Sequence, residues 1–194
     1  MKEAFLFMAY TVTRWRTTGA IAPSGRSLAR TIARAAGPIT DGQVIIELGP
    51  GTGVTTRELV KHFPKNRIVV VEIIEAFAAQ VEKTFPTVKV VRGDASHLDV
   101  HLKALGIAPS EVGAVLSGLP LLAFPPNVSH GILAAIRGVL EPGRRYVQFT
   151  YSRRAWRRFI IGGFRALTPK RVWLNIPPAS VLTFERTADA ATVS

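Results

Sequence analysis

The stretch Val44-Ile-Ile-Glu-Leu-Gly-Pro-Gly-Thr-Gly53 decides the fold of this chain. A short apolar run is followed by glycines at alternate positions, and residues 54–63 then show helical apolar spacing. The pattern predicts a strand, a tight loop and a helix. Three glycines leave room for a ligand against bare backbone, and the helix directs free N–H groups and its positive dipole end at that ligand. The negative side chain of Glu47 beside the loop disfavours a pyrophosphate and suits a cationic amine or a sulfonium better.

Two acids at later strand ends support a nucleotide-type site. Glu72 lies nineteen residues past Gly53, after the apolar run 67–71, and Asp94 follows a third predicted strand, Val88–Val91. A carboxylate at about this spacing binds a ribose diol in nucleotide-binding folds. An exposed acid at a strand end explains either residue alone. It does not account for both in register with the loop.

The motif Glu47-Leu-Gly-Pro-Gly-Thr-Gly53 resembles the first motif of the class I S-adenosylmethionine (SAM) methyltransferases at every position. The resemblance implies SAM as the cofactor, with S-adenosylhomocysteine as its product. It also implies that Asp94 meets the adenine amino group. The cofactor-binding residues that we expect on this basis are Glu47, Gly49, Pro50, Gly51, Thr52, Gly53, Glu72, Ile73, Gly93, Asp94, Ala95, Ser117 and Gly118.

Composition limits the other classes of site. The 194 residues suffice for one well-buried α/β domain, and the chain has no cysteine and four histidines. His97 and His101 share helical spacing, but without a third ligand we expect solvated histidines and no metal. The longest apolar region, 112–128, is broken by glycines and prolines, so we expect no bilayer-spanning segment, no signal peptide and an intracellular protein.

The net charge of +12 is concentrated at the two ends of the sequence. Residues 1–38 carry six Lys/Arg and one acid, residues 39–141 carry nine and ten, and residues 142–194 carry ten and two. A surface built from both ends attracts a polyanion, either an anionic membrane or a nucleic acid.

Residues 1–16 have the pattern of an amphipathic helix. Phe5, Met8, Val12 and Trp15 recur at helical spacing, and basic residues lie near both ends. Such a helix suits a membrane interface or a lid over the site, although it also fits a surface helix packed on the sheet. Residues 17–24 form a connection that can fold over the cofactor, and Ser24 can cap the helix that follows.

The alternation of strands and helices after residue 44 predicts a parallel sheet with crossover helices. A fourth strand is expected at Gly113–Leu116, a helix at Pro126–Leu140 and a fifth strand at Arg145–Tyr151. We expect Val172–Asn175 and Ser180–Glu185 to form an antiparallel edge, and Thr187–Ser194 to be a loose tail. The expected fold is a single Rossmann-like class I SAM methyltransferase domain over 1–194, with a seven-stranded, mostly parallel sheet and helices on both faces.

The sequence Ser117-Gly-Leu-Pro120 follows the fourth strand, where a ligand in an open parallel sheet meets the strand ends. Many amine and amide methyltransferases carry an Asn/Asp-Pro-Pro-Tyr type of tetrapeptide here, so the departure favours a small, non-planar amine. Tyr151 lies at the catalytic end of the fifth strand, whereas Tyr146 lies further back on the opposite face. We therefore expect Tyr151 to be the catalytic residue.

Further blocks narrow the resemblance to the bacterial phospholipid N-methyltransferases of the Rhodobacter type. The blocks are Arg16-Thr-Thr-Gly-Ala-Ile-Ala-Pro-Ser24, Glu47–Gly53, Ser117-Gly-Leu-Pro-Leu-Leu122, Gln148-Phe-Thr-Tyr151 and Val172-Trp-Leu-Asn-Ile-Pro-Pro-Ala179. The resemblance implies stepwise methylation of phosphatidylethanolamine to phosphatidylcholine by a cytoplasmic, peripherally membrane-associated enzyme. We expect an anionic phospholipid surface as partner, and neither nucleic acid nor metal. The expected substrate-binding residues are Tyr10, Trp15, Leu119, Pro120, Tyr151 and Arg153.

Arginine pairs beside aromatic residues in 153–159 suit a lipid phosphate or a nucleic acid. A solvated charged helix is the usual explanation of such a run. Here no Asp or Glu occurs from Pro142 through Phe184, which favours anion binding because the segment has no internal countercharge.

Two alternatives stay open. An rRNA adenine N6-dimethyltransferase shares the fold and charge, and Asn175-Ile-Pro-Pro178 resembles its catalytic Asn-Leu/Ile-Pro-Tyr/Phe motif. That motif should follow the fourth strand, so we expect the copy at 175–178 to lie far from the methyl group. The second alternative is a non-catalytic membrane-binding module that keeps SAM as a structural ligand.

Overall fold

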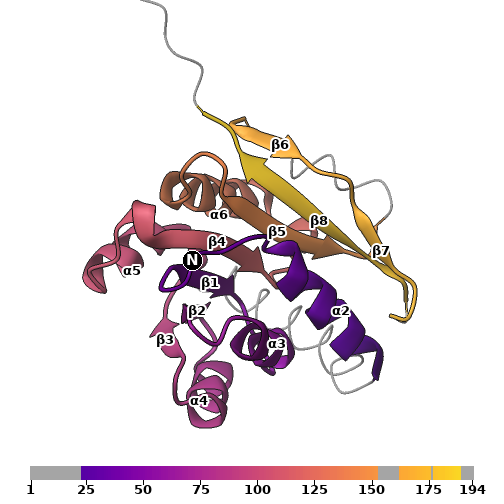
Figure 1. Ribbon diagram of the computed structural model, residues 1–194, viewed down its shortest axis with the longest axis horizontal. Coiled ribbons are helices and arrows are strands. Elements are labelled where there is room, and N and C mark those ends of the chain that lie inside the picture. Colours follow the sequence, from indigo (N-terminus) through magenta and orange to yellow (C-terminus); the bar gives the residue numbers. More distant parts are fainter. Residues whose placement is uncertain (1–22, 153–161, 176, 189–194) are drawn as a thin grey trace, which may run out of the picture.

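Eight strands form one sheet in the computed structural model, which describes residues 23–152, 162–175 and 177–188 (Figure 1). The spatial order is β3-β2-β1-β4-β5-β8-β6, and β7 also pairs with β8. The first five strands are mutually parallel, and β8 runs antiparallel to β5. The strands are β1 (Val44–Leu48), β2 (Arg67–Glu72), β3 (Lys89–Arg92), β4 (Val112–Ser117), β5 (Arg145–Thr150), β6 (Phe164–Ala166), β7 (Lys170–Val172) and β8 (Ala179–Arg186).

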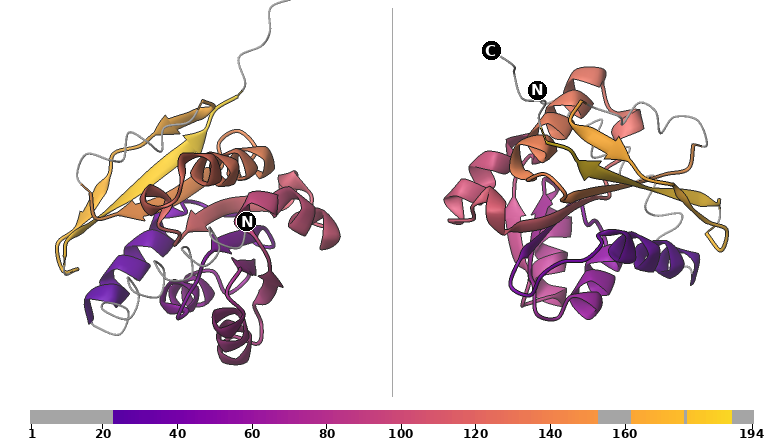
Figure 2. Two further views of the ribbon diagram at one scale, coloured as in Figure 1. Left: turned by 180° about the vertical axis from the view of Figure 1, so that it is seen from behind. Right: turned by 45° about the horizontal axis from the view of Figure 1, so that its top comes forward.

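Helices cover both faces of the sheet (Figures 1 and 2). One face carries α2 (Pro23–Ala35), α3 (Val54–His62) and α4 (Glu75–Thr84). The other carries α5 (Leu98–Ala104) and α6 (Pro126–Val139). Short 3₁₀ turns lie at η1 (Ala95–His97), η2 (Pro109–Glu111) and η3 (Leu121–Ala123). The central strand β1 is buried along its whole length because helices cover both of its faces.

The order of strands reverses between β1 and β4, because β2 lies on one side of β1 and β4 on the other. The loops that follow these two strands therefore separate at the carboxyl edge of the sheet. In open α/β sheets this is where a crevice for ligands forms. The fold thus brings the glycine loop after β1 and the loop after β4 to the same edge.

The Rossmann-like class I fold is the one that the sequence predicts, and four differences concern the details. The strand expected at Val172–Asn175 is wrong, because β7 ends at Val172 and a turn follows. The Asn175 side chain donates to the Pro177 carbonyl at 2.7 Å and closes that turn before two prolines, which cannot supply ladder N–H groups. Neither β6 nor α5 was predicted, and the sheet has eight strands rather than seven.

Several expectations lie outside the described residues. These are the helix at 1–16, most of the connection at 17–24, the arginine-rich run at 153–159 and most of the tail. Within the described part of the chain, no helix is both long enough and apolar enough to cross a membrane.

Candidate active site

The loop after β1 holds three glycines in the left-handed region of backbone conformation. Their φ angles are 64° at Gly49, 52° at Gly51 and 78° at Gly53. The Gly49 N–H donates to the Val71 carbonyl of β2 at 2.9 Å, which ties the loop to the neighbouring strand. Gly53 is the N-cap of α3 and provides no side-chain cap, so the first turn of α3 depends on other acceptors for its N–H groups.

Two of these glycines are also required by packing. A Cβ at Gly49 would overlap Leu119 Cδ2, and one at Gly53 would lie 2.7 Å from Phe85 Cε2. The sequence interpretation was that the glycines leave room for a ligand. In the structure, Gly49 and Gly53 make room for side chains of the protein itself, and Leu119 comes from the loop after β4.

Glu47 is the next-to-last residue of β1 and is 2% exposed. Its Oε2 accepts a hydrogen bond from the Thr56 hydroxyl at 2.6 Å. Thr56 is itself fully buried on α3. The buried carboxyl group thus joins strand and helix beneath the glycine loop.

Glu72, at the end of β2, is 4% exposed and binds two backbone amides. Its Oε2 accepts from the Gly51 N–H at 3.3 Å, and its Oε1 accepts from the Ile74 N–H at 3.0 Å. Each carboxylate oxygen has a second lone pair for a further donor. The side chain therefore fixes the glycine loop and can still accept hydrogen bonds from a diol. Ile73 lies between Glu72 and Ile74, whose N–H group Glu72 binds.

The end of β3 lies beside Glu72. The Gly93 N–H donates to the Glu72 carbonyl at 3.0 Å, and Asp94 Oδ1 accepts from the Ser96 N–H at 2.8 Å. A Cβ on Gly93 would lie 2.5 Å from the His101 ring, whose Nε2 lies 3.0 Å from the Asp94 carbonyl. His101 thus packs under this loop, and no group of three or more metal-ligating side chains occurs among residues that the structure describes.

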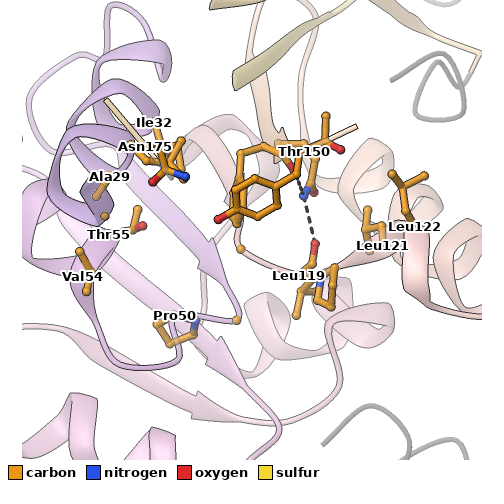
Figure 3. Close-up of a pocket in the computed structure, with 18 of the residues that line it drawn as sticks. Ala29, Ile32, Pro50, Val54, Thr55, Leu119, Leu121, Leu122, Thr150 and Asn175 are labelled. Carbon is orange, nitrogen blue, oxygen red and sulfur yellow. Dashed lines mark hydrogen bonds between the residues drawn. The ribbon is translucent and has the colours of Figure 1, made fainter. Parts of the chain in front are cut away.

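A cavity of about 380 Å³ opens between the glycine loop, α2, the loop after β4 and the end of β5 (Figure 3). Its wall is largely aliphatic and aromatic. Of the described side chains that line it, only Tyr151 is titratable. The lining residues are Gly25, Leu28, Ala29, Ile32, Gly49, Pro50, Thr52, Val54, Thr55, Gly118–Ala123, Gln148–Ser152 and Asn175.

A buried polar network holds the loop after β4 in place. Gln148, 1% exposed on β5, donates from Nε2 to the Leu119 carbonyl at 3.0 Å, and the Leu119 N–H donates to Ser117 Oγ at 3.2 Å. The Tyr146 hydroxyl donates to Gln148 Oε1 at 2.8 Å. Burial raises the pKa of Tyr146 far above its usual value, and a hydrogen bond with Ser117 acts weakly in the opposite direction. Tyr146 therefore stays protonated and keeps its donor role.

The structure separates the predicted site residues that it describes into three groups. Gly49, Pro50, Thr52, Gly118, Leu119, Pro120 and Tyr151 line the cavity together. Glu72 joins the edge of β3 to the glycine loop, and none of Glu72, Gly93, Asp94 and Ala95 lines the cavity. Glu47 and Ser117 lie buried beneath it. The roles of Tyr10, Trp15 and Arg153 concern residues outside the described part of the chain.

The two tyrosines of β5 have different surroundings. Tyr146 is fully buried and stacks on Phe184 with ring centroids 5.5 Å apart, in the layer that contains α6. Tyr151 packs against the opposite layer, with its ring edge-on to Phe149 at 5.8 Å, and lines the cavity. The choice of Tyr151 as the catalytic candidate thus agrees with its position, and its chemical role stays a prediction.

One position was predicted wrongly. Asn175 was expected far from the methyl group, but it is 4% exposed and lines the cavity, as Figure 3 shows. The cause is the antiparallel direction of β8, which pairs Ser180 with Thr150. The turn that precedes β8 therefore returns to the carboxyl edge of the parallel strands. Gln148 was quoted as part of the block 148–151, but no role was predicted for it or for the α2 residues Leu28, Ala29 and Ile32. A glutamine inside an apolar strand was the available signal for Gln148.

A model of the methyltransferase domain family matches residues 45–143, about half of the chain. The chain belongs to this family. SAM is accordingly the cofactor of this methyltransferase, as it or its product is in related folds of known structure. The residues present fit this group: Glu72 offers carboxylate oxygens at the tip of β2, and Gly53 leaves the first N–H groups of α3 without a side-chain cap.

Relatives extend the comparison beyond the family model. An ornithine lipid N-methyltransferase from Singulisphaera acidiphila is 31% identical over 183 residues, which cover 92% of this chain and 94% of the relative. Ribosomal RNA small subunit methyltransferase A of Moorella thermoacetica is 29% identical over 119 residues, covering 57% of this chain and 40% of the relative. The Burkholderia thailandensis 1,6-didemethyltoxoflavin-N1-methyltransferase, solved with S-adenosylhomocysteine, superimposes with a TM-score of 0.70 at 16% identity, covering 96% and 89% of the two chains. The last comparison supports the fold alone.

Proposed function

We propose that this methyltransferase transfers methyl groups from SAM to the primary amine of a membrane aminolipid, acting on the cytoplasmic side as a peripherally bound enzyme. The observation that carries the proposal is the apolar cavity next to the glycine loop. Its described lining is largely aliphatic and aromatic, with uncharged polar side chains and one tyrosine, and it has no carboxylate, imidazole or ammonium group. Such a wall suits a lipid headgroup region with its adjoining carbon chain better than a polar base.

Phosphatidylethanolamine is the substrate that the sequence blocks predict, with stepwise methylation to phosphatidylcholine. Ornithine lipid is the second candidate, because the relative that spans almost the whole chain acts on it. The two lipids share a primary amine near an anionic group, a phosphate in one and a carboxylate in the other. The excess of basic residues in 142–194 suits either anion.

SAM supplies a methyl group that is already activated by a sulfonium, so the protein contributes position, exclusion of water and handling of a proton. Leu119 and Pro120 are fixed by the Gln148 network at the cavity wall and orient the amine. The amine is a nucleophile only after it loses a proton. Tyr151, the titratable side chain of the described lining, is our candidate to accept a hydrogen bond from it, and loss of that proton to water on desolvation is the second route.

Tyr151 has a further role once methylation is complete. A quaternary ammonium has no N–H donor, and an aromatic face attracts it by about 0.5–2 kcal/mol. The aromatic ring beside the cavity thus suits both the amine and its methylated products. Tyr10 and Trp15, outside the described residues, are the other aromatic candidates from the sequence.

A methyl-transfer assay tests the proposal. Purified protein is incubated with methyl-labelled SAM and mixed micelles that contain phosphatidylethanolamine, ornithine lipid or neither, and the lipid products are resolved by mass. We expect label in the aminolipid and none in micelles of phosphatidylglycerol, which has no amine. Transfer to 16S ribosomal RNA but to no lipid would instead support the adenine dimethyltransferase. Tight SAM binding without transfer to either would support the non-catalytic module.

The ribosomal RNA alternative has less support. The relatives with that name match only 45–57% of this chain. The tetrapeptide after β4 is Ser117–Pro120, and the Ser117 hydroxyl accepts the Leu119 N–H. Asn175 lines the cavity, but its side-chain amide donates to the Pro177 carbonyl. A planar base thus lacks the polar residue that would hold its amino group at the position after β4.

A further inference from the structure

The turn between β7 and β8 exposes two large apolar side chains next to each other. Trp173 is 72% exposed and Leu174 is 77% exposed, the highest values for large apolar residues in the described part of the chain. Soluble surfaces carry single exposed apolar residues without consequence, but adjacent large ones at a projecting tip indicate a contact surface. Nothing in the cofactor site accounts for this pair.

The turn lies at the mouth of the cavity. Antiparallel pairing of Ser180 with Thr150 brings the start of β8 to the carboxyl end of β5. Asn175, next in sequence after Leu174, lines the cavity wall. Figures 1 and 2 show the β7–β8 hairpin extending past the sheet beside α2, and Figure 3 shows Asn175 next to Ile32 and Ala29 of that helix on the cavity wall.

The apolar tip has a defined conformation. The Asn175 side chain closes the turn through the Pro177 carbonyl at 2.7 Å, and the Arg171 guanidinium lies 5.4 Å from the centre of the Trp173 ring. Arg171 also donates to the Ser180 hydroxyl at 3.0 Å, across the hairpin. Trp173 is therefore presented outward from a fixed base, so little conformational freedom is lost when a partner covers it.

The surrounding chemistry identifies the partner. Lys170 and Arg171 flank the tip, and no acidic residue occurs from Pro142 through Phe184, so the hairpin is cationic. Tryptophan prefers the boundary between headgroups and acyl chains, and basic residues beside it attract anionic lipid. Leu174 has no base-stacking or hydrogen-bonding capacity and gains most from an apolar medium, which disfavours RNA as the partner.

We propose that the Trp173-Leu174 turn inserts into the interfacial region of an anionic lipid bilayer and holds the mouth of the cavity against the membrane. This inference rests on the proposed function, because it gives the aminolipid a short path from the bilayer to the cavity. It also supplies a second membrane contact besides the helix expected at 1–16. Two such contacts give more stable anchoring than either alone.

The depth of Trp173 in vesicles tests this directly. The chain has three tryptophans, so Trp15→Phe with Trp156→Phe leaves Trp173 as the only emitter. The protein is added to vesicles of phosphatidylglycerol and phosphatidylcholine, with or without bromine on the acyl chains. We expect a blue shift and at least twofold quenching by the brominated lipid. Unquenched emission from protein that sediments with the vesicles would overturn the inference.

A second comparison uses the otherwise unmodified protein. Trp173→Ala with Leu174→Ser should weaken binding to the same vesicles at least fivefold, without changing SAM affinity by calorimetry. Val100→Ser is the matched control, because Val100 is 57% exposed on α5, away from the turn in both figures. Equal binding of the two variants to vesicles would overturn the inference. So would a result in which Trp173→Ala with Leu174→Ser weakens binding of an RNA oligonucleotide but leaves vesicle binding unchanged.

The aminolipid assay on the unmodified protein separates the two claims. Quenching of Trp173 without methylation of any aminolipid would support the membrane contact and refute the proposed function. Methylation of an aminolipid without quenching would do the reverse.

Discussion

Glu72 has two tasks that depend on the same carboxylate. It accepts hydrogen bonds from the N–H groups of Gly51 and Ile74, and it is almost completely buried. Hydrogen bonds to an ionised acceptor are stronger than neutral ones, so the side chain both shapes the loop and keeps negative charge at the tip of β2. A ribose diol needs that charge to be in place before it binds.

Glu72→Gln should lower SAM affinity at least tenfold. The amide places an NH₂ donor against one of two backbone N–H donors, and it removes the charge that receives the diol. Isothermal calorimetry with SAM and with S-adenosylhomocysteine measures the effect. Glu75→Gln is the control, because Glu75 is exposed and pairs with Arg92 on the surface. Equal affinities for the two variants would contradict the role of Glu72.

Tyr151→Phe separates the hydroxyl of Tyr151 from its ring. If the hydroxyl accepts the hydrogen bond from the amine, kcat should fall by about 10²-fold or more, while SAM affinity and the affinity for a quaternary ammonium product stay unchanged. Single-turnover kinetics with a saturating aminolipid measure the methyl-transfer step. An unchanged rate would assign the proton to water and leave Tyr151 only its aromatic face.

At the scale of elements, the loop after β4 is held from both sides. Gln148 binds the Leu119 carbonyl from β5, and Leu119 packs where Gly49 has no Cβ. Leu119 thus holds the loop after β4 in a fixed position relative to both the glycine loop and β5. The cavity wall depends on this contact, since Leu119 and Pro120 form part of it.

Gln148→Leu should lower kcat more than it changes the KM for SAM. The variant preserves volume but removes the hydrogen bonds that Gln148 makes with the Leu119 carbonyl and the Tyr146 hydroxyl, which costs about 1–3 kcal/mol of stability. Tyr146→Phe removes the hydrogen bonds of the Tyr146 hydroxyl but keeps the Gln148–Leu119 bond, so it should have the smaller effect on kcat. Gln80→Leu, on the exposed side of α4, is the surface control. Steady-state kinetics and urea unfolding give both quantities, and a kcat equal to that of the control would refute the positioning role.

Gly49→Ala tests the packing of the two loops. Gly49 and Gly42 both have positive φ, at 64° and 85°, but a Cβ at Gly42 has nothing within 4 Å. Gly42→Ala should therefore cost only backbone strain, about 1–2 kcal/mol. Gly49→Ala should cost more and also displace Leu119, so that methylation falls with stability. Urea unfolding of both variants shows whether the difference exists, and equal costs would contradict the close approach.

The elements that follow local rules could be predicted, and those set by distant pairing could not. The strand, loop and helix at 44–62 follow from the glycine spacing and the apolar period, and the positions of Glu72 and Asp94 at strand ends follow from the same alternation. Their roles toward SAM stay predictions. Asn175 was misplaced because its position depends on the direction of β8, which only long-range pairing fixes. Gln148 had no motif that gave it a role, since its partners come from the loop after β4 and from its own strand.

At the scale of the whole molecule, the excess of basic residues lies in different parts of the sequence from the glycine loop and its acids. The basic excess is in the first 38 and last 53 residues, while the segment that builds the glycine loop and its acids is almost neutral. The β7–β8 hairpin belongs to the basic part and ends at the cavity mouth. The division allows the molecule to approach an anionic surface without neutralising Glu47 and Glu72.

Binding to vesicles should therefore depend on salt in two stages. Surface charges are screened over about 8 Å at 0.15 M salt and about 3 Å at 1 M, so raising NaCl over this range should remove most of the electrostatic attraction. The apolar contribution of the Trp173-Leu174 turn persists, because salt does not weaken burial of apolar groups. Vesicle sedimentation across this range should show affinity falling and then levelling at a plateau. In Trp173→Ala with Leu174→Ser the plateau should be lower while the initial slope stays the same, because the charge is unaltered. A plateau unaffected by the substitution, or binding independent of salt, would show that charge and turn do not act together.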